Sequence, residues 1–358
     1  MNANADEKEE YRRSISRRTT MIGVSAAILV VLVVLSCAVG TGYSVTQTFG
    51  VIWDHITGVE LVKRSPEWWA DYYICNNVMP GVIMAAVAGA GLAIAGAVMQ
   101  SIMENPLADA YTTGISSGAC LGAVAALISG FTFASFASGM GIMVNAFIGA
   151  LVPAVIVIFL TRLVGNSPST MILIGTALSY FFNAMVTLIM VTASSESLQD
   201  AYMWQIGSVS GASWSDIPLM FVMVLISSIL VQLVASKLNL MSLGEKSAKS
   251  LGLDVSKFRM LCLILISFLV ASIISFTGII GFIGLVAPHM ARYIVGADNR
   301  FAVPLSVMMG AIVLVMADVV SRLLYTYGNV EVGIIMSFLG APVFLYLIIR
   351  RKSAKEVF

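Results

Sequence analysis

KLNLMSLGEKSAKSLGLDVSKFR, residues 237–259, is a long polar interruption between two apolar runs. Its residue pattern predicts two short helices. Ser242 followed three residues later by Glu245 has the form of a capping box, in which each side chain satisfies a backbone N–H. We expect a helix of about nine residues to follow and to end at Gly252, because glycine tolerates the left-handed conformation that ends helices.

The residues after this glycine predict a second helix. Leu253 would pack back on the end of the first helix, and Asp254 would N-cap the helix that leads into the next apolar run. Two short capped helices between apolar runs have two interpretations. They form either a solvated loop or a docking surface through which another subunit moves the membrane part.

Composition places the chain in the membrane. Hydrophobic residues make up 59% of the 358 residues, charged residues make up 11%, and the mean hydropathy is +0.94. Charged residues average about 25% in soluble globular domains. The sequence therefore predicts an all-α polytopic membrane protein. The net charge of +1 gives no indication of a nucleic-acid partner.

The apolar runs predict about ten membrane-spanning helices. Residues 1–18 form a polar tail, and the first apolar run, Thr19–Val39, has about 21 residues, which is enough to span. This length and the lack of a small-residue cleavage site favour an anchor over a removed signal peptide. The further predicted spans are 78–101, 111–129, 140–164, 169–193, 214–236, 260–276, 280–295, 302–326 and 331–350.

The distribution of basic residues predicts the orientation. If the N-terminus lies inside, 17 of the 20 lysines and arginines fall in inner segments. By the positive-inside rule, the N-terminal tail, the 237–259 helices and the tail at 351–358 all lie in the cytoplasm. One transmembrane domain then covers residues 19–350.

Two irregular stretches share a design. The second span is rich in alanine and glycine, which let helices approach closely. It ends at Asn105-Pro106, where an N-cap followed by proline predicts that a new helix begins. Residues 281–292, GFIGLVAPHMAR, again place glycines before a proline. Spans two to five and seven to ten begin on opposite faces, as in an inverted internal repeat. Broken helices at membrane depth favour a transporter over a purely structural protein.

Other classes of function have less support in the residues. The four cysteines lack metal-ligand spacing, so no metal, disulfide or redox role is predicted. No polar cluster has the acid, base or metal partners of an enzyme. An ion-coupled secondary transporter needs ionisable groups in the membrane, and the chain offers little beyond Asp318, His289 and Arg322.

Five motifs resemble the FecCD family, the permeases of ABC importers for iron–siderophore complexes, haem and cobalamin. They are NPLADAYTTGISSGA (105–119), SLGEKSAKSLGL (242–253), GFIGLVAPHMAR (281–292), ADVVSRLL (317–324) and GAPVFLYL (340–347). The resemblance implies a ten-helix type II permease in the cell membrane that dimerises around a central path. It also implies two cytoplasmic ATPase subunits that bind the ATP, an extracytoplasmic substrate-binding protein, and no cofactor on this chain. The cargo would be a metal chelate, with a molybdate- or tungstate-type oxyanion as the alternative.

The resemblance also implies roles for individual residues. Asn105 and Leu107, with Ser169 and Thr170, resemble positions that narrow the cytoplasmic end of the path. Residues 197–211 resemble a short helix near its outer mouth. The positions that resemble the ATPase-coupling helices are Ser242, Leu243, Gly244, Glu245, Ala248, Leu251, Gly252 and Leu253.

Receptor docking is less well defined by the sequence. Arg322 resembles an outward-facing docking arginine, but its i,i+4 spacing from Asp318 also fits a structural ion pair. The family usually has arginines before the second span, where this chain has Val78 and Gly81. His289 is interpreted as a structural hydrogen-bonding residue more readily than as a ligand or proton relay.

Overall fold

The computed structural model describes residues 3–133, 140–324 and 330–355, and this part of the chain is all-helical. The long helices are α1 (Ala3–Ser36), α4 (Met79–Ile102), α5 (Ile115–Ser129), α6 (Gly141–Val164), α7 (Pro168–Val191), α9 (Ile217–Leu233), α12 (Val255–Thr277), α13 (Ile283–Val295), α14 (Asn299–Leu324) and α15 (Val332–Lys355). The shorter helices are α2 (Val45–Thr57), α3 (Pro66–Tyr73), the π-helix η1 (Ile74–Val78), the 3-10 helix η2 (Ala110–Thr113), α8 (Ser195–Ile206), α10 (Ala235–Ser242) and α11 (Glu245–Ser250).

The described helices correspond in order to the ten predicted spans. Six of them are long and apolar enough to cross a membrane, and α9 with α10 forms a further candidate span bent by 62°. Three shorter apolar helices, Ile115–Ser129, Ile283–Val295 and Val332–Tyr346, match the remaining predicted runs. The prediction of an all-helical protein with several membrane spans is confirmed.

Helix α4 lies at the centre of the bundle because its small residues allow neighbouring backbones to approach. In its most apolar stretch 89% of the residues are buried, against 11% in α1 and 17% in α7. A Cβ atom added at Gly89 would lie 2.2 Å from the carbonyl oxygen of Gly310, and one at Gly96 would lie 1.9 Å from that of Gly284. These contacts seat α14 and α13 directly on α4.

The two irregular stretches of the sequence, at Asn105-Pro106 and at 281–292, lie close together where α13 packs on α4. The side chain of Gln100 at the end of α4 donates from Nε2 to the carbonyl oxygen of Gly284, at 3.0 Å. The hydroxyl of Tyr111 in η2 donates to the carbonyl oxygen of Ile280, at 2.9 Å. Backbone carbonyls left without helical partners at the breaks are thus satisfied by side chains from the other half of the chain.

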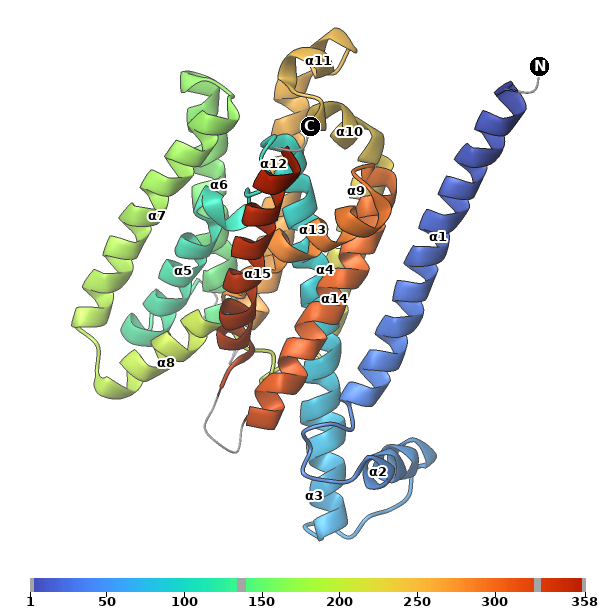
Figure 1. Ribbon diagram of the computed structural model, residues 1–358. Helices are drawn as coiled ribbons and strands as arrows, with labels where there is room; N and C mark the ends of the chain where they lie inside the picture. The colour runs from blue at the N-terminus through green and yellow to red at the C-terminus, as the bar shows by residue number, and fades with distance from the viewer. Residues whose placement is uncertain (1–2, 134–139, 325–329, 356–358) are drawn as a thin grey trace.

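The ends of the bundle carry different elements (Figure 1). Helices α10 and α11 lie at the same end as the beginning of α1 and the end of α15, whereas α2, α3 and α8 lie at the opposite end. The predicted N-terminal tail is helical from Ala3 and continuous with the first span. Residues 351–355 of the predicted C-terminal tail extend α15, and 356–358 lie outside the described residues.

Candidate functional site

The segment that the sequence marked for docking forms a bent pair of short helices, but it begins differently from the prediction. The predicted capping box is wrong. Ser242 is the last residue of α10, and its hydroxyl donates to the carbonyl oxygen of Leu238 at 3.0 Å. Because α10 already includes Ser242, that hydroxyl bonds back within its own helix instead of capping the next one. Helix α11 begins after Gly244 without a side-chain cap.

The end of α11 follows the prediction, although the helix has six residues rather than about nine. Gly252 has φ +85°, and its N–H donates to the carbonyl oxygen of Lys249 at 3.0 Å. The N–H of Leu253 donates to the carbonyl oxygen of Ala248 at 3.0 Å, which completes a Schellman motif. Asp254 accepts from the N–H of Lys257 at 3.1 Å and N-caps α12.

Two exposed leucines flank the polar helix α11. Leu243 before α11 and Leu251 after it are 62% and 61% exposed, whereas Ala248 between them is fully buried. The buried alanine fixes which face of α11 packs on the protein. Exposed apolar side chains beside charged ones are typical of a surface that another protein covers.

Arg259 connects this surface to the interior. It is the fifth residue of α12, its side chain has no exposed surface, and its Nε donates to the carbonyl oxygen of Ile102 at 3.0 Å. Its Nη1 donates to the carbonyl oxygen of Asn166, and its Nη2 donates to Oε2 of Glu245 at 3.2 Å. Glu104 lies 3.6 Å from the same Nη2 atom. One guanidinium therefore holds the end of α4, the α6–α7 loop and α11 together.

The charge of Glu245 is stabilised in place. A hydrogen bond from Lys249, at 2.8 Å, and the nearby Arg259 hold the pKa of this carboxyl below its usual range. Glu245 is therefore ionised at neutral pH, and the ion pair with Arg259 is intact there.

The predicted gate residues fall into two segments. In the first, Asn105 does not start a helix at Pro106, so that prediction is wrong. Oδ1 of Asn105 instead accepts from the N–H of Leu107 at 3.0 Å, which forms a local turn, and regular structure resumes only at η2. The Leu107 side chain is 43% exposed.

In the second segment, Ser169 and Thr170 lie in the first turn of α7. Ser167 caps this helix, because its Oγ accepts from the N–H of Thr170 at 3.1 Å. The structure joins the two gate segments indirectly. Arg259 binds the carbonyl of Ile102, three residues before Asn105, and that of Asn166, three residues before Ser169.

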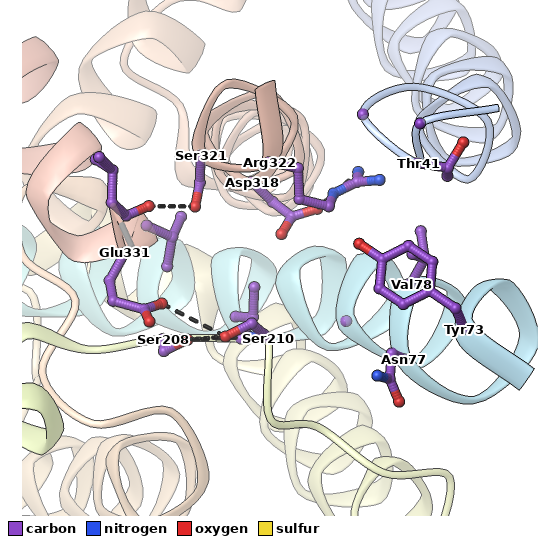
Figure 2. Close-up of a pocket in the computed structure, with 16 residues that line it drawn as sticks. Thr41, Tyr73, Asn77, Val78, Ser208, Ser210, Asp318, Ser321, Arg322 and Glu331 are labelled. Carbon is purple, nitrogen blue, oxygen red and sulfur yellow. Dashed lines mark hydrogen bonds and ion pairs between the residues drawn. The ribbon is translucent and has the colours of Figure 1, made fainter. Parts of the chain in front are cut away.

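Arg322 lies at the opposite end of the bundle, in the wall of a cavity of about 530 Å³ (Figure 2). Its Nη2 is 2.9 Å from Oδ2 of Asp318, and its Nη1 donates to the carbonyl oxygen of Val39 at 2.7 Å. Its side chain is 13% exposed, and the short distance to Asp318 shows that the structural ion pair, one of the two interpretations of this spacing, is present. Val78 and Gly81 line the same cavity.

Two other predictions concern single residues. Residues 195–206 form α8, so a short helix follows the fifth span as the resemblance implied. Nδ1 of His289 lies 3.0 Å from the carbonyl oxygen of Leu285, within its own helix.

The role of Arg259 was not predicted, because in the sequence this residue is one of several basic residues of the polar stretch 237–259. Its immediate neighbours, Phe258 and Met260, are apolar, and an arginine within an apolar helical turn was the available signal.

The family profile of the FecCD transport family matches residues 28–350. The hemin transport system permease protein HmuU of Yersinia pestis is 32% identical over 337 residues, covering 94% of this chain and 97% of that protein. The cobalamin import system permease protein BtuC of Halobacterium salinarum is 38% identical over 271 residues, covering 75% and 71% of the two chains.

A solved structure shares the fold. It is described as an inward-facing conformation of a metal-chelate type ABC transporter, and it is 29% identical with a TM-score of 0.79 over 93% of this chain and 99% of its own. The chain therefore belongs to the FecCD transport family and is a multi-pass permease subunit of an ABC importer, not an enzyme, with ATP hydrolysis on separate subunits.

Proposed function

We propose that this permease moves a metal chelate into the cytoplasm, with iron–siderophore, haem and a cobalamin-like corrinoid as the candidate cargoes. The names of the similar proteins, which include hemin and cobalamin permeases, support this class of cargo. In this proposal two ABC ATPase subunits bind the ATP, an extracytoplasmic binding protein delivers the cargo, and the chain needs no cofactor for transport.

One structural relationship supports the role of the ATPase most directly. The exposed Leu243 and Leu251 flank α11, and Arg259 ties α11 to the segments that precede Asn105 and Ser169. A force applied to α11 by an ATPase would reach both gate segments through one side chain. We therefore assign residues 242–253 to ATPase coupling, and Asn105, Leu107, Ser169 and Thr170 to the cytoplasmic gate.

The location of the gate supports a dimer. Helix α7 begins with two gate residues, yet only 17% of its most apolar stretch is buried. A path lined by a helix at the edge of the bundle needs a second copy of the chain to close it. Formation of a disulfide between copies of Ser169→Cys would test this arrangement, with Leu233→Cys, at the exposed last residue of α9, as the control position.

The proposed orientation has both termini in the cytoplasm of a cell membrane. The beginning of α1, the end of α15 and α11 lie at one end of the bundle (Figure 1), the end that carries most of the basic residues.

The proposal is tested by reconstitution in proteoliposomes with the cognate ATPase and binding protein. Uptake should require ATP hydrolysis and the binding protein. Uptake driven by a proton or sodium gradient without the ATPase would contradict the proposal. Binding of haem, corrinoid and ferric siderophores to the purified binding protein then identifies the cargo.

A further inference from the structure

A histidine, an aspartate and a cysteine converge at the α2–α3 end of the bundle. His55 lies in the last turn of α2, Asp71 lies in α3, and Cys75 lies in the π-helix η1. One possible ligand atom from each residue lies within 4.8 Å of the other two. None of these residues belongs to the coupling segment, the gate or the Arg322 cavity.

The local structure explains how the three side chains meet. Asp71 and Cys75 are four residues apart in the continuous helix that runs from α3 through η1, so they share one face. A π-helical turn begins at Ile74, and such turns recur at functional sites because they redirect side chains. Helix α2 supplies the third group, since Nδ1 of His55 is 2.8 Å from Oδ1 of Asp71.

The three side chains are increasingly exposed, from Cys75 in the interior to His55 at the surface. Cys75 is 2% exposed, and the side chains of Asp71 and His55 are 17% and 50% exposed. The sulfur therefore lies in the core, whereas the imidazole lies at the solvent boundary, so the trio faces solvent on its His55 side.

We propose that His55, Asp71 and Cys75 form a binding site for Zn²⁺ or a similar borderline divalent cation, with water as the fourth ligand. Mixed imidazole, carboxylate and thiolate donors are typical of zinc sites. In a tetrahedral site with the bond lengths usual for zinc, the ligand atoms lie about 3.3–3.8 Å apart. The His55–Asp71 pair, now at 2.8 Å, would open slightly, and a pair at the 4.8 Å limit would close by about 1 Å.

The charge balance favours a divalent ion. The ion displaces the proton of the Cys75 thiol, which is released to solvent, so that a thiolate and a carboxylate together neutralise the two positive charges. The surrounding segments also carry Asp54, Glu60 and Glu67 against Lys63 and Arg64, and excess acidic charge raises the local cation concentration. The bound ion would fasten α2 to the helix that continues into α4. The sequence suggested no such site because the three ligands are scattered along 21 residues of the chain.

The test is titration of the full-length, chelator-treated protein in nanodiscs with Co²⁺, followed by displacement with Zn²⁺. We expect one Co²⁺ per chain, with a thiolate-to-cobalt charge-transfer band and the intense visible bands of a tetrahedral site. Cys75→Ser should abolish the charge-transfer band, whereas Cys120→Ser, which alters a buried cysteine in α5, should leave it unchanged.

His55→Gln provides a second variant on a half-exposed side chain, so it keeps the test valid if Cys75→Ser does not fold. We expect it to weaken Zn²⁺ binding by about 10–100-fold or more, the loss found when even indirect metal contacts are removed. Absence of the charge-transfer band in the wild-type protein would overturn the site. So would a band that survives Cys75→Ser, or equal Zn²⁺ affinity in wild type and His55→Gln. The trio would then be only a hydrogen-bonded pair beside a buried thiol.

Discussion

Nη2 of Arg259 lies 3.2 Å from Oε2 of Glu245, so a fully buried guanidinium in α12 holds the first residue of α11. The same side chain binds backbone carbonyls at the end of α4 and in the α6–α7 loop. Three elements far apart in the sequence therefore cannot move independently without breaking hydrogen bonds of a buried charge. Such a loss is costly in a protein interior.

Glu245→Gln should reduce the cargo imported per ATP hydrolysed. The variant keeps the shape of the side chain and removes its charge. Because the Glu245 side chain is 34% exposed, we expect its interaction with Arg259 to weaken by about 1 kcal/mol. This corresponds to about fivefold less cargo imported per ATP hydrolysed. The measurement is uptake and ATPase activity in the same proteoliposomes.

Lys249→Gln is the matched control for this prediction. It removes the other charge that pairs with Glu245, at 2.8 Å, and leaves the contact with Arg259 in place. If Lys249→Gln reduces coupling as much as Glu245→Gln, the effect comes from the surface of α11 and not from the buried link.

Gly252→Val should also uncouple ATP hydrolysis from uptake while the membrane helices stay folded. Gly252 has φ +85°, and an added Cβ would meet no atom within 4 Å, so the penalty is conformational. Left-handed backbone costs a side chain about 1–2 kcal/mol, and more for a β-branched one. Asparagine tolerates this conformation, so Gly252→Asn should retain most of the coupling. Normal transport by the valine variant would show that the turn does not matter.

The sequence could predict those elements that depend on local chemistry. Hydropathy located the ten apolar runs, and Gly252 and Asp254 ended one helix and began the next as expected. The capping box failed because Ser242 also fits the last turn of a helix, and it ends α10, which follows the 62° bend after α9. Contacts such as those of Arg259 join residues 93 to 157 positions apart, and no local pattern specifies them.

Asn105→Ala should loosen the cytoplasmic gate. The substitution removes the hydrogen bond that Oδ1 accepts from the N–H of Leu107, which contributes about 0.5–1.5 kcal/mol. We expect raised basal ATPase activity and a raised leak of cargo in the absence of the binding protein. Asn105→Asp keeps the acceptor oxygen and should behave nearly as wild type. Wild-type values for the alanine variant in both assays would remove Asn105 from the gate.

Arg322 gives the sharpest test of receptor docking, because its ion pair with Asp318 is already part of the fold. Arg322→Ala should weaken binding of an acidic receptor surface, but it also leaves the Asp318 side chain, 6% exposed, without its partner. Breaking a buried pair in this way costs about 3–5 kcal/mol and would reduce the yield of folded protein. The single variant therefore cannot separate docking from stability.

The double variant Asp318→Asn with Arg322→Gln separates the two roles, because it removes both charges and keeps both polar shapes. If Arg322 contacts the receptor, the folded double variant should bind it about tenfold more weakly in nanodiscs, mainly through faster dissociation, because the net charge of the cavity is unchanged. Glu331→Gln is a control for which we expect the opposite effect on receptor binding. Glu331 lines the same cavity, and removal of its negative charge should speed the approach of an acidic receptor. A folded double variant that binds the receptor as tightly as wild type would show that Arg322 only stabilises the fold. Docking would then depend on other contacts around the cavity. Gly81 leaves little room there for a basic side chain, because an added Cβ would lie 3.2 Å from the carbonyl oxygen of Val209.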